Sequence, residues 1–216
     1  MNAAATVRIT EIFYSLQGEA HSVGWPTVFV RLTGCPLRCS YCDTAYAFHG
    51  GERRSLPQVL DEVAGYHARY VCVTGGEPLA QPAVRALLAQ LCQAGYAVSL
   101  ETSGALSIAD IAADVSIVMD LKTPTSGESH RNLYENLELI RSRDQIKFVI
   151  GNHDDYVWSC KILQEYDLGR RCEVLFSPSY GQMEPARLAE WVLADRLLVR
   201  VQIQLHKVLW GEARGR

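Results

Sequence analysis

The pattern that most constrains this fold is an alternation of short, β-branched apolar runs with segments whose apolar residues recur at helical spacing. We expect strands at 27–33, 70–73, 97–100, 116–119, 145–150, 173–176 and 199–205. We expect helices at 56–68, 82–94, 108–113, 132–141, 154–166 and 184–194. Alternation of this kind indicates βα units in a mainly parallel sheet with helices outside, and roughly six units are too few for an eight-fold barrel. The prediction is an α/β fold with reduced helices, an open partial (β/α)6-type barrel in a single domain, 1–216.

Two helix starts carry local signals. Ser55 precedes Pro57, so its hydroxyl is expected to cap the first expected helix. Asp154 is expected to cap the helix that begins near residue 156.

Polar motifs follow these expected strands where each one ends. A cysteine-containing loop follows the first strand, and TGGEP (74–78) follows the second. ETSG (101–104) follows the third strand and DLKTP (120–124) follows the fourth. SPS (177–179) follows the sixth strand and HK (206–207) follows the last. The carboxyl ends of parallel strands open on one face, where such folds assemble their active sites. We therefore expect these motifs to meet at one mouth, as in an enzyme.

Three of the seven cysteines lie close together, as Cys35-x3-Cys39-x2-Cys42. Iron–sulfur clusters take thiolate ligands, and three closely spaced cysteines would leave the fourth iron of a [4Fe–4S] cluster open to a small molecule. The alternative is a structural zinc site completed by His49 or Asp43, although such sites usually place their ligands in two separated pairs. The other four cysteines, Cys72, Cys92, Cys160 and Cys172, are expected to be free thiols that pack as small hydrophobic side chains.

Charge and hydropathy exclude some partners. The formal net charge is −3 without a basic stripe, which argues against nucleic-acid binding. No apolar run approaches the ~20 residues that cross a bilayer, so no membrane partner is expected. Residues 1–6 show no export signal, and we expect a cytoplasmic protein with reduced thiols.

The motif CPLRCSYC at 35–42, followed by GGEP at 75–78, resembles the signature of the radical S-adenosylmethionine (SAM) superfamily. The resemblance implies a radical SAM barrel in which Cys35, Cys39 and Cys42 hold a [4Fe–4S] cluster that cleaves SAM to a 5′-deoxyadenosyl radical. The SAM-binding residues that it implies are Tyr41, Cys42, Asp43, Gly76, Glu77, Ser103, Asp120, Leu121, Lys122 and Ser177. A serine or aspartate after a strand is also a common helix cap, and that alternative stays open for Ser103, Asp120 and Ser177.

A longer resemblance covers nearly the whole chain. The segments EIFYSLQGE (11–19) and FVRLTGCPLRCSYCDT (29–44), together with TGGEP, ETSG, DLKTP and QLHK (204–207), resemble the 7-carboxy-7-deazaguanine synthase family. This implies conversion of 6-carboxy-5,6,7,8-tetrahydropterin to 7-carboxy-7-deazaguanine, with ring contraction and loss of ammonia. The implied substrate-binding residues are Leu16, Gln17, Gly18, Glu19, Arg31, Thr74 and His206. The hydroxyl of Thr44 is implied as a ligand of Mg²⁺.

The same resemblance implies a homodimer, a flavodoxin- or ferredoxin-type reductant, an N-terminal substrate-binding extension (1–26) and a C-terminal closing segment (199–216). For three residues a purely structural role remains the alternative. Arg31 could lie on a solvated strand face, His206 could be a structural histidine and Thr44 could be a cap or turn residue. At the level of function, the alternatives are a glycyl-radical-activating enzyme and a non-catalytic metal-binding module.

Overall fold

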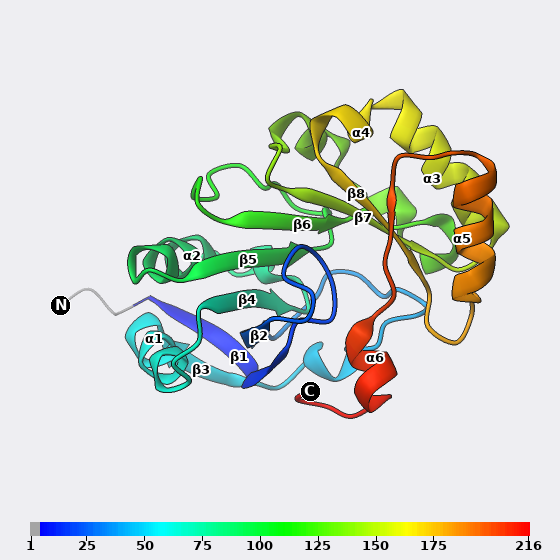
Figure 1. Cartoon of the computed structure of the whole chain (residues 1–216). Coiled ribbons are helices and arrows are strands. Elements are labelled where there is room, and N and C mark those ends of the chain that lie inside the picture. The colour runs from blue at the N-terminus through cyan, green and yellow to red at the C-terminus, as the bar shows by residue number, and fades with distance from the viewer. Residues whose placement is uncertain (1–4) are drawn as a thin grey trace.

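The computed structural model describes residues 5–216, and within them nine strands form one twisted sheet (Figure 1). The strands are β1 (Thr6–Leu16), β2 (Pro26–Leu32), β3 (Glu52–Ser55), β4 (Tyr70–Gly75), β5 (Ala97–Thr102), β6 (Ser116–Asp120), β7 (Gln145–Ile150), β8 (Glu173–Pro178) and β9 (Arg200–Val201). Their order is β3-β1-β2-β4-β5-β6-β7-β8-β9; β1 is antiparallel to both neighbours, and the other pairs are parallel. Because β3 and β9 remain as edges, the expected open, mainly parallel barrel is confirmed.

Helices cover the outer face of this sheet. They are α1 (Leu56–Gly65), α2 (Val84–Gln93), α3 (His153–Glu165), α4 (Leu168–Arg171) and α5 (Pro185–Ala194). The helix α6 (Leu205–Trp210) instead lies on the inner side, where Leu205 N donates to Gly18 O. Strand side chains alternate between faces, and the outward set, such as Val28, Val30 and Phe148, is fully buried in one hydrophobic cluster with the helices. Each buried side chain of this size contributes roughly 1.5–3 kcal/mol. None of the helices described for residues 5–216 has both the length and the hydrophobicity of a membrane-spanning helix.

One helix start is as expected and the other is not. Ser55 caps α1 through a capping box, since its hydroxyl accepts from Gln58 N while the Gln58 side chain accepts from Ser55 N. The helix expected from Asp154 begins earlier, at His153, and its cap is Asn152, whose side chain accepts from Asp155 N. Asn152 has the extended backbone of a cap, whereas Asp154 lies in the first turn, where a negative charge favours the helix dipole.

Three expected elements were wrong in type or extent. Residues 108–113 form turns, in which Asp110 is left-handed (φ 62°) and Ile108 N donates to the side chain of Asn136. Within 132–141 the structure has a 3-10 helix, Tyr134–Leu139. The run 199–205 contains only the two-residue strand β9 before α6 begins. Short apolar runs do not separate a strand from a helix or a turn, and tertiary contacts decide them.

The β1–β2 loop, residues 17–25, crosses the open side of the barrel. Ala20 N donates to Gln202 Oε1 (2.6 Å), Gln202 Nε2 donates back to Ala20 O (3.3 Å), and Leu205 N donates to Gly18 O (3.0 Å). In Figure 1 this blue loop accordingly runs beside the red C-terminal segment. The loop precedes β2, so it enters at the amino ends of the parallel strands, opposite the loop that carries the three cysteines.

Candidate active site

The barrel interior holds a cavity of about 440 Å³. Because strand residues alternate, the face opposite the helices carries polar side chains in place of the apolar core. The charged or polar members of this inner face that line the cavity are Arg31 (β2), Thr74 (β4), Glu101 (β5), Asp120 (β6) and Lys147 (β7). Charges removed from water need partners, so these residues have either protein partners or ligands.

The cysteine loop follows β2 and lies at the carboxyl end of the cavity. Cys35, Cys39 and Cys42 are half-buried free thiols that all line the cavity. The loop is held through its backbone, since Gly34 O accepts from Glu77 N (2.7 Å) and Ser40 N donates to Ser126 O (3.0 Å). Burial raises the pKa of all three thiols, that of Cys39 to about 11. Metal binding deprotonates such thiols, and the donor set of three cysteines on one loop suits an iron–sulfur cluster.

The zinc alternative fits this geometry poorly. Among residues 5–216, no group of three or more His, Cys, Asp and Glu side chains converges closely enough to hold one metal ion. His49, a candidate fourth ligand, is exposed and is not one of the residues lining the cavity.

Glu77 of the TGGEP motif lies behind the cavity and joins two motifs. It is fully buried, and its carboxylate accepts four hydrogen bonds, from Leu79 N (2.9 Å), Thr102 Oγ1 (2.9 Å), Ser103 N (2.7 Å) and Ser103 Oγ (2.6 Å). It is absent from the lining within the described chain, so its contacts position Ser103, which does line the cavity.

Gly76 brings the TGGEP motif against the cysteine loop. A Cβ at this position would lie 2.0 Å from Gly34 O, a backbone atom. Only glycine therefore permits this contact, and Gly76 itself lines the cavity.

At the same end, Asp120 and Lys122 form an ion pair, with Lys122 Nζ 3.0 Å from Asp120 Oδ2. Burial alone would lower the pKa of Lys122, but Asp120 outweighs it and raises that pKa above the ordinary value. Two buried atoms, Asp120 Oδ1 and the Tyr41 hydroxyl, have no hydrogen-bond partner in the part of the chain that is described. Unpaired buried polar atoms are costly, so these fit a ligand with polar groups, as SAM has.

Besides Glu77, two of the expected SAM-binding residues do not line the cavity among the described residues. Leu121 is fully buried in the hydrophobic core, and its backbone N donates to Lys147 O (2.9 Å). Ser177 is buried within β8. Their expected roles remain predictions.

The amino end of the cavity is lined by the expected segment Leu16, Gln17, Gly18 and Glu19. Gln17 Nε2 donates to Glu101 Oε1 (3.2 Å), and Thr74 Oγ1 donates to Glu101 Oε2 (2.9 Å). Glu19 Oε2 lies 3.1 Å from Lys147 Nζ. This segment therefore reaches the interior from the opposite end to the other motifs.

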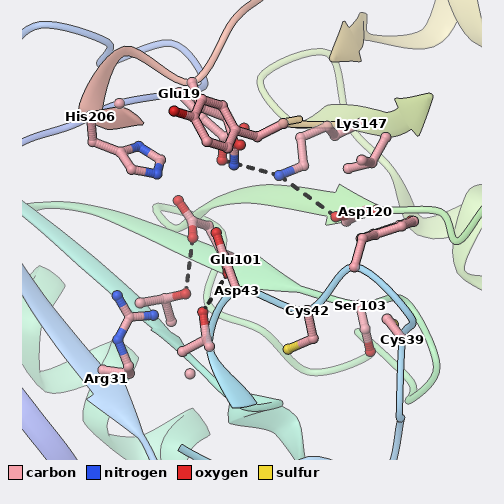
Figure 2. Close-up of a pocket in the computed structure, with 18 of the residues that line it drawn as sticks. Glu19, Arg31, Cys39, Cys42, Asp43, Glu101, Ser103, Asp120, Lys147 and His206 are labelled. Carbon is pink, nitrogen blue, oxygen red and sulfur yellow. Dashed lines mark hydrogen bonds and ion pairs between the residues drawn. The ribbon is translucent and has the colours of Figure 1, made fainter. Parts of the chain in front are cut away.

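Arg31 and His206 line different parts of the cavity (Figure 2). Arg31 is the next-to-last residue of β2 and lies beside Thr74 near the carboxyl end of β4, whereas His206 lies beside Gly18. Arg31 Nε donates to Glu11 Oε1 (2.7 Å), which also accepts from Tyr46 Oη (2.7 Å), and the arginine side chain is only 16% exposed. Arg31 therefore faces the cavity and not a solvated surface. His206 lies on α6, and its ring packs so closely on Gly18 that a Cβ there would be 2.1 Å from Nδ1.

Asp43 and Thr44 stand together after the last cysteine of the loop. Thr44 Oγ1 donates to Asp43 Oδ1 (2.7 Å), and Lys207 Nζ lies 3.8 Å from Asp43 Oδ2. Burial opposes ionisation of Asp43, but the Thr44 hydrogen bond and Lys207 lower its pKa. Both side chains line the cavity and offer oxygen atoms to a hard cation.

Sequence reasoning missed Glu11, Glu101 and Lys147. Lys147 is the only charged residue in the run QIKFVI, the same signal that singled out Arg31, so it could have been found. Glu101 is the first residue of the ETSG motif, in which the resemblance implied a role only for Ser103. The tail residues Glu212 and Arg216 also line the cavity and carry no such signal.

Comparisons with known proteins agree with this site. The family model of the Radical SAM superfamily matches residues 29–176. A protein of Chlorobaculum tepidum called 7-carboxy-7-deazaguanine synthase is 41% identical over 100% of both chains. A protein of the same name from Methanospirillum hungatei is 42% identical over 94% of this chain and 85% of the relative.

Solved structures show the same fold. The crystal structure of QueE from Escherichia coli matches with a TM-score of 0.78 at 24% identity and covers 93% of this chain and 95% of that one. Streptococcus suis SuiB bound to its precursor peptide SuiA matches with a TM-score of 0.57 at 13% identity, over 84% of this chain and 49% of SuiB.

Membership of the superfamily implies a [4Fe–4S] cluster and SAM, and the cysteine loop with its neighbouring unpaired polar atoms fits both. These relatives carry the name of the family that the sequence resembles. They favour that family over the two alternatives, a glycyl-radical-activating enzyme and a non-catalytic metal-binding module. The chain is thus a radical SAM enzyme and belongs to the 7-carboxy-7-deazaguanine synthase family.

Proposed function

We propose that this enzyme converts 6-carboxy-5,6,7,8-tetrahydropterin to 7-carboxy-7-deazaguanine in a Mg²⁺-dependent reaction that contracts the ring and releases ammonia. The observation that carries the proposal is a single cavity lined by the three cysteines, by Gln17 and Glu19 of the β1–β2 loop and by Arg31 of β2. The names of the full-length relatives support the reaction. Substrate and product differ by one ammonia, so the conversion needs no net oxidant.

At the carboxyl end, Cys35, Cys39 and Cys42 would hold the [4Fe–4S] cluster. The cluster and SAM together supply a 5′-deoxyadenosyl radical that abstracts a hydrogen atom from the substrate. The residues proposed to hold SAM are Tyr41, Cys42, Asp43, Gly76, Glu77, Ser103, Asp120, Leu121, Lys122 and Ser177. Of these, Glu77 would act by positioning Ser103, because its carboxylate already accepts four hydrogen bonds.

At the amino end, the protein would bind and orient the pterin. The carboxylate of Glu19 would accept from the 2-amino group, and the backbone of Leu16 and Gly18 would pair with the amide-like edge. Arg31 would bind the substrate carboxylate, since its Nε is occupied by Glu11 and the terminal nitrogens of the fork face the cavity. Gln17 and His206 would add polar contacts at the same end, and Thr74 would do so beside Arg31, near the carboxyl ends of β2 and β4.

Mg²⁺ would bind at Thr44, with Asp43 beside it. The ion prefers oxygen ligands and retains waters, and its charge would orient the substrate carboxylate. Thr44→Ala should therefore weaken the dependence of turnover on Mg²⁺ concentration. An unchanged Mg²⁺ titration in this variant rejects the role of Thr44.

One anaerobic assay tests the reaction. The reconstituted enzyme is incubated with SAM, dithionite, Mg²⁺ and 6-carboxy-5,6,7,8-tetrahydropterin, and the products are separated by liquid chromatography with mass detection. We expect 7-carboxy-7-deazaguanine, and its formation should require the pterin. Formation of 5′-deoxyadenosine without this product would reject the proposal.

We further propose a single radical SAM domain in which residues 1–26 form a substrate-binding extension and 199–216 a closing segment. Residues 1–4 of that extension lie outside the described residues. The contacts of Gly18 and Ala20 with Leu205 and Gln202 support this division, because they tie the two segments together. Deleting residues 207–216 should raise KM for the pterin more than it changes SAM binding.

The remaining partners are proposed from the family resemblance. They are a flavodoxin- or ferredoxin-type reductant and a second copy of the chain, in the cytoplasm. Of these, the homodimer can be tested directly. Light scattering after size-exclusion chromatography would report the mass of the protein in solution, and the mass of a monomer would reject the homodimer.

A further inference from the structure

Lys147 lies between the two halves of the cavity. Its Nζ is 3.1 Å from Glu19 Oε2, at the amino end, and 3.6 Å from Asp120 Oδ2, at the carboxyl end. Figure 2 shows the ammonium group between the two carboxylates. All three side chains are strongly buried: Lys147 is 12% exposed, Glu19 is 11% exposed and Asp120 is 15% exposed. One buried cation thus contacts one acid from each end.

Each of these carboxylates has one oxygen near Lys147 and one that is unpaired. Glu19 Oε1 and Asp120 Oδ1 are buried without a hydrogen-bond partner in residues 5–216. A buried acceptor without a donor costs about 1–3 kcal/mol, which a ligand donor can relieve. Lys147 therefore holds each acid so that its second oxygen remains available to a ligand.

The charges around Lys147 keep it protonated. Burial alone would lower its pKa, but Glu19, Asp120 and Glu101 outweigh it and raise the pKa above its usual value. Lys122 is a second cation of the cluster, and its Nζ lies 3.0 Å from the same Asp120 oxygen, Oδ2. A neutral lysine could not hold two acids, so this protonation maintains the bridge.

We infer that Lys147 is a positioning residue that couples substrate binding at Glu19 to SAM binding at Asp120. The inference rests on the proposed function, which assigns these two ends. Whichever ligand binds first fixes the shared ammonium and its two carboxylates, and the second then binds to a network that is already ordered. Coupling of this kind is reciprocal, so the pterin should tighten SAM binding and SAM should tighten pterin binding by the same factor.

The coupling is measured in the reconstituted holoenzyme with the cluster oxidised, so that no turnover occurs. Calorimetric titration under anaerobic conditions gives the Kd of SAM with and without saturating 6-carboxy-5,6,7,8-tetrahydropterin. In the unmodified enzyme we expect the pterin to lower the Kd of SAM about fivefold or more, the lower end of measured couplings. In Lys147→Gln the ratio should fall close to one, whereas Lys147→Arg, which keeps a cation, should retain part of it.

Lys161→Gln is the matched control, because Lys161 is an exposed lysine on α3. It should retain the full ratio, and circular dichroism checks that each variant is folded. An unchanged ratio in Lys147→Gln, or no coupling in the unmodified enzyme, overturns the inference while leaving the proposed reaction intact. Failure of the unmodified enzyme to bind the pterin overturns both.

A second variant keeps the inference testable if Lys147→Gln does not fold. Glu19→Gln removes the charge that balances Lys147 on the substrate side, and the excess positive charge then lies next to Asp120, where the cationic SAM is proposed to bind. In the absence of pterin, we expect the Kd of SAM to be about threefold or more higher in this variant than in the unmodified enzyme. This change is expected although Glu19 lies at the amino end of the cavity and SAM is proposed to bind at the carboxyl end. An unchanged Kd in this variant also overturns the inference.

Discussion

The two ends of the cavity are built differently. At the carboxyl end, the cysteine loop is fixed mainly by backbone hydrogen bonds, while its three thiols, the Tyr41 hydroxyl and Asp120 Oδ1 are left for ligands. At the amino end, where the β1–β2 loop enters, most polar side chains already have partners, as in Gln17 with Glu101 and Glu19 with Lys147.

This difference indicates two ways of preparing a site. The carboxyl end is complete only with its cluster and SAM, so changes there should act on assembly. The amino end is preorganised by its own side chains, which lowers the ordering cost of binding a small substrate. Changes there should act on affinity.

The largest effect is expected from Cys39→Ala. Loss of one of the three thiolates should abolish cluster assembly and activity, as iron and sulfide analysis and the product assay would report. Cys160→Ala is the control, since Cys160 lies on α3 outside the cavity lining, and it should spare both. Normal cluster content in Cys39→Ala would contradict the assignment of the loop.

Gly76→Ala should come next. The added Cβ would meet Gly34 O at 2.0 Å, and because this is a backbone atom the cysteine loop must shift. A displacement on the order of 1 Å at a reacting centre can lower kcat about a hundredfold. The electron paramagnetic resonance spectrum of the reduced cluster should change as well, and an unaltered spectrum with full kcat would show that the two loops move independently.

Gly18→Ala is the counterpart at the amino end and should be milder. Its Cβ would meet His206 Nδ1 at 2.1 Å and the His206 backbone N at 3.1 Å. The histidine side chain can turn away, so the backbone has to move only slightly. Strain of about 1–2 kcal/mol corresponds to a roughly 5- to 30-fold higher KM for the pterin, with cluster content unchanged. Equal losses in cluster content for the two glycine variants would break the distinction between the ends.

Glu11→Gln should have a smaller effect. The ion pair with Arg31 is mostly buried, but glutamine keeps an oxygen that can accept from Arg31 Nε, so only the charge is lost. We expect a cost of about 1 kcal/mol, a roughly fivefold higher KM. Steady-state kinetics measures it, and kcat should be close to that of the unmodified enzyme. A fall in kcat at constant KM would place Arg31 elsewhere in the reaction.

The smallest effect is expected from alkaline pH on SAM binding. The pKa values of Lys122 and Lys147 are raised, so the stabilisation from their charges is fully present below the ordinary lysine value and is lost only as pH rises through the higher folded values. The Kd of SAM should stay nearly constant from pH 7 to about 9.5. A tenfold weakening within this range would show that one of these lysines titrates early.

Much of the fold followed from local patterns. The strands β2 and β4 to β8 and the Ser55 cap were predictable because alternation and capping depend on neighbours in the chain. The strands β1 and β3 carry little local signal, because a register shift between Ile9 and Glu11 interrupts the alternation of β1 and because β3, with the sequence ERRS, has no apolar side chain. Residues 108–113 have apolar residues at helical spacing, but Ile108 N donates to the distant Asn136 side chain and the segment forms turns.

For the site, the sequence by itself determined the chemistry, because the spacing of Cys35, Cys39 and Cys42 and the order of the strand-end motifs are local properties. Only the tertiary structure decided that residues 17–19 enter from the opposite end, and that Glu11, Glu101 and Lys147 hold the residues expected to bind ligands. Glu19 and Lys147 are 128 positions apart. A pairing between such distant residues is set by the packing of the whole barrel, and no local pattern encodes it.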